Sequence, residues 1–158
     1  MFLVSYIVSM AEEKKRVWVW FGVMILRDWK VLLGQRHEDP EKASSLMHGE
    51  WTWTMPGGKM HFHETFEEMA YRETLEETWL KIDKEKIKLI SLTNDIVYDN
   101  HFVTIWFLCQ WVQWEPQVME PDEITKWARF DINDLPSPLY FPSERVIKNY
   151  LDKTVYKH

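Results

Sequence analysis

Carboxylates at helical spacing are the residues of this chain best suited to do chemistry. Glu73, Glu76 and Glu77 follow Arg72, and at about 100° per residue they share an arc of roughly 100° on a helix. Like charges at this spacing repel, so the stripe gains nothing unless a cation neutralises it. Hard divalent cations take oxygen ligands and commonly also hold substrate phosphates. The stripe therefore predicts a Mg²⁺ or Mn²⁺ site for phosphate chemistry, with an ordinary solvated helix as the alternative.

A longer pattern surrounds this stripe and resembles the Nudix box. The box runs Gly, five residues, Glu, seven residues, Arg-Glu, an aliphatic, any residue, Glu-Glu, any residue, Gly, an aliphatic. Two positions depart from it, because Thr74 replaces the first aliphatic residue and Trp79 replaces the last glycine. The positions that match are Gly58, Glu64, Arg72, Glu73, Glu76, Glu77 and Leu80.

The resemblance implies a role for each acid. Expected metal ligands are the carbonyl of Gly57 and the carboxylates of Glu73, Glu76, Glu77 and Glu120. Glu76, Glu77 and Glu120 are also the expected catalytic acids and bases. Glu120 lies in a loop that also holds Asp122 and Glu123, and a merely solvated loop is the alternative there.

The remaining expected site residues bind substrate or hold the motif together. Arg36 is placed to meet phosphates, with an ordinary surface arginine as the alternative, and Lys59 is expected to bind substrate. Tyr140 and Phe141 are candidates to stack on a base, or alternatively anchor the last helix. Gly58, Glu64 and Arg72 are expected to be structural, with Arg72 orienting the glutamates through a bidentate contact.

Strand and helix signals place these residues in an α/β fold. Thr65 followed by Glu68 is a capping-box pattern, which predicts a helix over residues 65–79. Tyr71, Leu75 and Trp79 are expected to face the core, and Trp79 is expected to avoid the left-handed conformation, which costs a tryptophan about 1 kcal/mol or more. Strands are expected over 17–26, 31–33, 51–55, 87–98, 101–112 and 126–131, a helical turn over 133–136 and a last helix over 143–153. The Nudix resemblance implies that these elements form an α/β/α sandwich with a mixed central sheet.

Composition indicates one domain and excludes several functions. We expect a single domain over residues 16–158, preceded by an extension over 1–15 that is interpreted either as partly disordered or as containing a mis-assigned start over its first nine residues. Its apolar beginning is too short to span a bilayer. A net charge of −6 argues against binding duplex nucleic acid. The single cysteine, Cys109, cannot form an internal disulfide, which favours a cytoplasmic setting.

Residues outside the box favour one substrate class without deciding it. The segments around 53–59, 72–77, 101–105 and 120–121 are similar to MutT-like nucleoside triphosphate diphosphatases. This likeness implies metal-dependent hydrolysis of a (d)NTP, a small-molecule partner, to the monophosphate and pyrophosphate. ADP-ribose or another sugar nucleotide is the alternative substrate, and a non-catalytic nucleotide sensor is a third. Homodimers are common among such proteins, and the many aromatic residues permit one.

Overall fold

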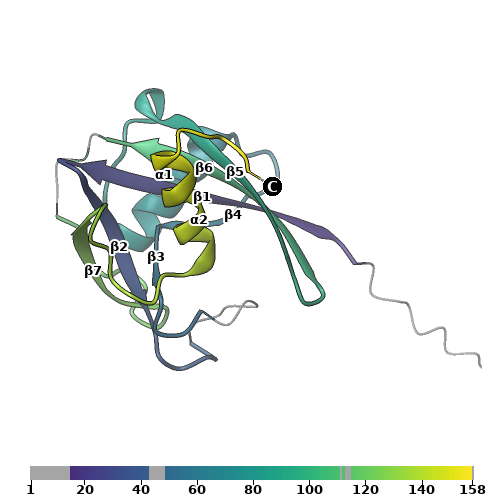
Figure 1. The fold of residues 1–158 in the computed structure, drawn as a ribbon, viewed down its shortest axis with the longest axis horizontal. Coiled ribbons are helices and arrows are strands. Elements are labelled where there is room, and N and C mark those ends of the chain that lie inside the picture. The colour runs from purple at the N-terminus through teal and green to yellow at the C-terminus, as the bar shows by residue number, and fades with distance from the viewer. Residues whose placement is uncertain (1–14, 43–48, 111, 113–114, 158) are drawn as a thin grey trace, which may run out of the picture.

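The computed structural model describes residues 15–42, 49–110, 112 and 115–157 (Figure 1). Except for Lys15, the expected extension over residues 1–15 lies outside the described residues and stays a prediction. The elements are β1 (Val17–Arg27), β2 (Lys30–Arg36), β3 (Trp53–Thr54), β4 (Gly57–Lys59), α1 (Phe66–Thr78), a 3₁₀ turn (Lys84–Lys86), β5 (Lys88–Val97), β6 (Asn100–Cys109), β7 (Ile124–Asp131) and α2 (Phe141–Leu151). No helix among the described residues is long and apolar enough to cross a membrane.

Seven strands of the described part form one mixed sheet. Its main path runs β3-β2-β1-β6-β5, while β4 pairs with β1 and β7 pairs with β2. The longest pairing is parallel and joins β1 to β6, from Val17 opposite His101 to Ile25 opposite Cys109. The expected hairpin of β5 and β6 is confirmed as antiparallel. The first half of β1 and the tip of this hairpin extend together beyond the two helices (Figure 1).

The two helices cover opposite faces of the sheet, which confirms the α/β/α arrangement. Because the side chains of a strand alternate between its two faces, β1 contributes residues to both cores. Phe21, Val23 and Ile25 join the core under α1, whereas Met24 and Leu26 join the core under α2. The residues that the helices contribute to these cores are Met69 and Ala70 from α1 and Val146 and Ile147 from α2.

Helix α1 begins as expected but buries a different face. Thr65 caps its first turn, and the reciprocal bond from the backbone N–H of Thr65 to Glu68 completes the capping box. The side chains it buries are Met69, Ala70, Thr74 and Thr78. The expected core position of Trp79 is wrong, because this side chain is 52% exposed. Of the two buried threonines, Thr78 donates its hydroxyl to the Thr74 carbonyl, whereas the Thr74 hydroxyl finds no partner among the described residues.

The end of α1 corrects a second expectation. Trp79 adopts the left-handed conformation (φ 61°, ψ 6°), and its N–H donates to the Leu75 carbonyl at 2.9 Å. This turn directs the chain back so that Leu80 is fully buried. Burial of a leucine contributes about 1.5–3 kcal/mol, which exceeds the cost of about 1–2 kcal/mol for a left-handed tryptophan.

Two shorter elements also differ from the sequence expectation. Residues 56–58 carry a Pro-Gly-Gly turn signal that ends the strand expected over 51–55, yet residues 57–59 form β4 against β1 because glycines allow close approach. A Cβ on Gly57 would lie 2.1 Å from the Phe21 carbonyl oxygen. In place of the helical turn expected over 133–136, only residues 133 and 134 form a turn and a bend, where the Asp131 carboxylate accepts from the Asn133 N–H at 2.9 Å.

Candidate active site

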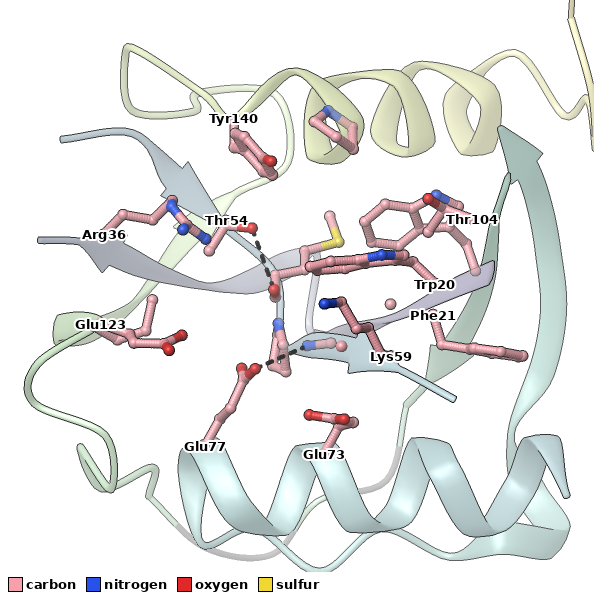
Figure 2. Close-up of a pocket in the computed structure, with 18 of the residues that line it drawn as sticks. Trp20, Phe21, Arg36, Thr54, Lys59, Glu73, Glu77, Thr104, Glu123 and Tyr140 are labelled. Atoms are coloured by element: carbon pink, nitrogen blue, oxygen red, sulfur yellow. Dashed lines mark hydrogen bonds between the residues drawn. The ribbon is translucent and has the colours of Figure 1, made fainter. Parts of the chain in front are cut away.

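A cavity of about 650 Å³ opens between α1, the sheet and the start of α2 (Figure 2). Pockets of this size suit a small nucleotide. Acidic side chains from α1 and from the loop before β7 line one part, and aromatic side chains from β1 and β6 line another. Of the expected site residues, Arg36, Gly57, Gly58, Lys59, Glu73, Glu77, Glu120 and Tyr140 line the cavity.

Of the three motif acids on α1, Glu77 has the weakest support from protein partners. Its side chain points from α1 toward β4 (Figure 2), where it accepts a long hydrogen bond of 3.4 Å from the Gly57 N–H. It forms no ion pair with any of the described residues. Burial, followed by the nearby charges of Glu73 and Glu120, raises the pKa of Glu77 well above its ordinary value. A carboxylate withdrawn from water without a cation is costly, so this position favours binding of a cation.

Arg72 forms ion pairs with the other acids of the motif. Its guanidinium donates to both oxygens of Glu64, at 2.7 and 2.9 Å, and to Glu73 at 2.7 Å. It also donates to Glu76 at 3.1 Å and to the Lys59 carbonyl at 3.2 Å. The bonds from Arg72 lower the pKa of Glu64. One side chain therefore joins the loop before α1, the helix and β4.

Glu73 lies between this arginine and the cavity. A Cβ on Gly58 would lie 2.5 Å from a Glu73 carboxylate oxygen, so only glycine lets β4 pass so close to the acid. Burial raises the pKa of Glu73, while the bond to Arg72 opposes that rise. Gly58 thus has a definite spatial role beside the acid stripe.

The loop before β7 adds two acids, Glu120 and Glu123, of which the sequence favours only Glu120. Both line the cavity, and Figure 2 shows Glu123 on the same side as Glu77. Burial and then the charge of Glu123 raise the pKa of Glu120. The loop rests on the end of α1, where the Gln117 N–H donates to the Thr78 carbonyl at 2.9 Å. Loop acids and helix acids therefore face one space although they are distant in sequence.

These acids suit a hard divalent cation. Carboxylate oxygens are the ligands that Mg²⁺ prefers, and Glu77 supplies a partly buried negative charge that no described cation neutralises. Within the described ranges, however, no three Asp, Glu, His or Cys side chains converge on one point. The donor types therefore fit the expected Mg²⁺ or Mn²⁺, whereas the full ligand set stays a prediction.

Two residues expected to act directly on metal or substrate lie away from the cavity wall. Glu76 is half-exposed (51% of its side chain) and turned toward Arg72. Phe141 is absent from the cavity wall, because the chain enters α2 there and its ring lies beside Tyr140, with centroids 5.6 Å apart. The expected roles of Glu76 and Phe141 have no geometric support here and stay predictions.

Two cationic residues reach the cavity from different strands. Lys59 of β4 places its ammonium 4.6 Å from the Trp18 ring centre and 5.6 Å from that of Trp20. Arg36, at the end of β2, lies 5.1 Å from the Tyr140 ring centre. Aromatic faces attract such cations and hold them in position. Both positive charges therefore line the same cavity as the acids, as binding of a phosphate chain requires.

The aromatic part of the cavity does not follow from the sequence analysis. Trp20 of β1 and Phe102, Thr104 and Trp106 of β6 line it. The Trp20 and Phe102 rings meet edge to face at 5.8 Å, and Trp106 packs over Gly22, where a Cβ would come within 2.1 Å of its ring. The alternation of Trp18 and Trp20 is visible in the sequence, but the pairing that brings β6 beside β1 is not.

Comparison with known proteins gives a consistent family match. The NUDIX domain family model matches residues 17–150. An ADP-ribose pyrophosphatase of Methanocaldococcus jannaschii is 30% identical over 128 residues, 81% of this chain and 69% of that protein. A MutT NUDIX hydrolase from Burkholderia pseudomallei superposes with a TM-score of 0.74 at 28% identity, over 85% of this chain and 98% of that one. The NUDIX domain of Shewanella oneidensis NrtR, complexed with ADP ribose, shares the fold (TM-score 0.69, 19% identity, 88% and 89% covered).

Proposed function

From its membership of the Nudix family, whose relatives make it a pyrophosphohydrolase, we propose a specific reaction for this chain. It hydrolyses a nucleoside triphosphate to the monophosphate and pyrophosphate with the help of a divalent cation. The observation that carries the proposal is the cavity itself. An unpaired, partly buried acid, with Arg36 and Lys59 nearby, suits a cation and phosphates, while the aromatic wall suits a flat base.

The reaction balances with water as the only co-reactant. Water attacks the phosphorus next to the nucleoside, a new P–O bond forms, and the bridging P–O bond to pyrophosphate breaks. The proton of the water goes to a carboxylate facing the cavity. Glu77 and Glu120 are suited to this step because burial and neighbouring charge raise the pKa of both. A bound Mg²⁺ or Mn²⁺ would neutralise the phosphates and lower the pKa of the attacking water.

Each protein group then has a defined task. Glu73 and Glu77, one helical turn apart, would hold the cation, and Gly57 lies beside them on β4. Arg36 and Lys59 would bind phosphate oxygens that the cation leaves free. Arg72 would keep Glu73 oriented without touching substrate, since its donors already bind Glu64, Glu73, Glu76 and a carbonyl.

ADP-ribose is the second candidate substrate, because a 30% identical relative carries the name ADP-ribose pyrophosphatase. The same acids and cations serve both substrates, since both contain a phosphoric anhydride. A triphosphate carries more negative charge than a diphosphate, so two cationic side chains beside the acids favour the triphosphate.

A hydrolysis screen with Mg²⁺ tests the proposal. The panel contains the common (d)NTPs, 8-oxo-dGTP, ADP-ribose, diadenosine tetraphosphate and a nucleotide sugar, with products separated by chromatography. Wild-type protein should release pyrophosphate and a monophosphate from a triphosphate, and Glu77→Gln should lower kcat/KM about 10²–10³-fold. Glu67→Gln is the matched control, because Glu67 is an exposed acid on the first turn of the same helix.

Other products would reassign the activity. AMP with ribose 5-phosphate, and no cleavage of any triphosphate, would move the protein to the ADP-ribose class. Nucleotide binding without turnover of any compound would contradict the enzyme proposal and leave a nucleotide sensor.

A further inference from the structure

Two polar groups of the aromatic wall have no partner in the described protein. The indole N–H of Trp20 is shielded from solvent and finds no acceptor among the described residues. The hydroxyl of Thr104, a residue only 7% exposed, makes no hydrogen bond with the part of the chain that the structure describes. Buried polar groups in native proteins are nearly always hydrogen-bonded. The shielded, unpaired N–H of Trp20 in a cavity wall therefore indicates a ligand, and the Thr104 hydroxyl in the same wall is a second polar group that could bind it.

Sheet register places these two residues side by side. Trp20 of β1 and Thr104 of β6 are paired positions in the parallel ladder, and both side chains belong to the cavity wall (Figure 2). Trp106, two residues further along β6, donates its own indole N–H to Thr93 at 3.3 Å. The contrast shows that this sheet can satisfy a tryptophan N–H, yet within the described residues it leaves that of Trp20 unpaired.

The surroundings define what kind of group would fit. Phe102 meets Trp20 edge to face, and Trp106 lines the same region. The acids, the cation they favour and Arg36 lie elsewhere in the cavity, whereas Lys59, 5.6 Å from the Trp20 ring centre, marks where the phosphates would border this wall. A flat ring with hydrogen-bonding atoms on its edge suits it well, since its faces are apolar and its edge carries acceptors and donors.

We propose that Trp20 and Thr104 together bind the polar edge of the substrate's nucleobase and determine which base is accepted. The Trp20 N–H donates to a ring nitrogen or carbonyl oxygen, and the Thr104 hydroxyl donates to or accepts from the adjacent edge atom. The inference rests on the proposed function, because it assumes that the phosphates occupy the acidic part. To the proposed function, the inference adds the residues that would distinguish one nucleobase from another.

Two isosteric replacements remove these groups with little change of shape. Benzothienylalanine at position 20 replaces the indole N–H by sulfur, and Thr104→Val replaces the hydroxyl by a methyl group. Benzothienylalanine at Trp29 is the matched control, because Trp29 lies in the β1–β2 turn and is 62% exposed. Neither replacement breaks a hydrogen bond within the described protein, so both variants should melt no lower than wild type.

Calorimetric titration with two kinds of probe separates the base from the rest of the substrate. The probes are the common nucleoside monophosphates and ribose 5-phosphate, all in buffer with Mg²⁺. The tightest monophosphate should bind about 5- to 50-fold more weakly to each variant, while ribose 5-phosphate binds all proteins alike. The control at Trp29 should bind both probes as wild type does.

Three results would overturn the inference. Equal weakening of both probes would place the pair at the sugar or phosphate. Unchanged binding of every monophosphate would mean that the pair does not contact the base, and wild-type protein that prefers no monophosphate over ribose 5-phosphate would have no base site. Failure of the triphosphate proposal would show separately, in the hydrolysis screen. The titration would still test the base site in that case, because AMP carries the same base as ADP-ribose.

Discussion

The acidic and aromatic parts of the cavity are built in opposite ways. The acidic part brings Glu73, Glu77 and Glu120 to one cavity, where burial is the main cause that raises the pKa of each and neighbouring acids add to the rise. It costs stability until a cation binds. The aromatic part packs Trp20, Phe102 and Trp106 on the sheet, and this burial stabilises the fold with or without ligand. One part is prepared for chemistry at the expense of stability, whereas the other combines recognition with the core.

After the loss of activity expected for Glu77→Gln, Arg72→Lys should have the largest effect and act on the acidic part alone. Lysine cannot reproduce the fork that joins Glu64 to Glu73, so Glu73 loses its orientation. We expect kcat/KM to fall about 10- to 100-fold, measured in the Mg²⁺ assay. Arg129→Lys is the control, since Arg129 binds the exposed Glu115 at the surface. Activity equal to wild type in Arg72→Lys would show that Glu73 needs no such support.

Gly22→Ala tests the aromatic part. The added methyl group would meet the Trp106 ring, and overpacking of this kind costs about 1–3 kcal/mol. Urea denaturation should show the loss in the free energy of unfolding. Combining it with Trp106→Leu, which removes the ring, should cost less than the sum of the single changes. Strict additivity would mean that the ring moves aside without strain.

Glu77→Gln should stabilise the metal-free protein, which sharpens the contrast between the two parts. Its folded-state pKa is raised above the ordinary 4.5, so the wild-type carboxyl is fully compatible with the fold below pH 4.5. As the pH rises through the folded-state pKa, the buried carboxyl ionises and the free energy of unfolding falls. In EDTA the variant should melt higher than wild type by roughly 2–4 °C for each 1 kcal/mol gained, with the difference growing as the pH rises from 4.5.

Added Mg²⁺ should reverse this order, because only the wild type gains stability by binding the cation at Glu77. The measurement is a series of thermal melts with EDTA or Mg²⁺ at each pH. A wild-type protein that melts above the variant in EDTA at neutral pH would contradict the idea that the acidic part is strained.

Trp79→Gly should give the smallest effect and concerns the end of the helix that carries the acids. Glycine adopts the left-handed conformation of this residue without steric cost, so we expect a gain of about 0.5–1 kcal/mol. Trp79→Ala is the control, because alanine keeps the steric penalty. If both variants lose the same stability, the half-exposed indole contributes more than the backbone conformation does.

The two parts also differ in how far the sequence predicts them. Short-range spacing decides the acidic part, so the order of residues along the chain is enough to place Thr65, Arg72 and the glutamates on one helix. The buried face of α1 could not be predicted, because it depends on which side of the helix meets the sheet. The aromatic wall depends on the pairing of Trp20 with Thr104, and no local pattern encodes a partner so distant in the chain. The conformation of Trp79 is mispredicted because the sequence shows only the local steric penalty of a left-handed tryptophan. The burial of Leu80, which offsets that penalty, depends on tertiary packing.

The parallel pairing of β1 with β6 has a consequence for how the protein folds. Residues 17–25 pair with 101–109, so nearly the whole chain between them must be closed into a loop before these strands meet. Contacts of such long range form slowly, whereas α1 with its capping box can begin to form from local interactions. Refolding should therefore produce helical signal before the tryptophans of the cavity become buried. Nucleotide binding, which needs both parts of the cavity, should be the last property to return.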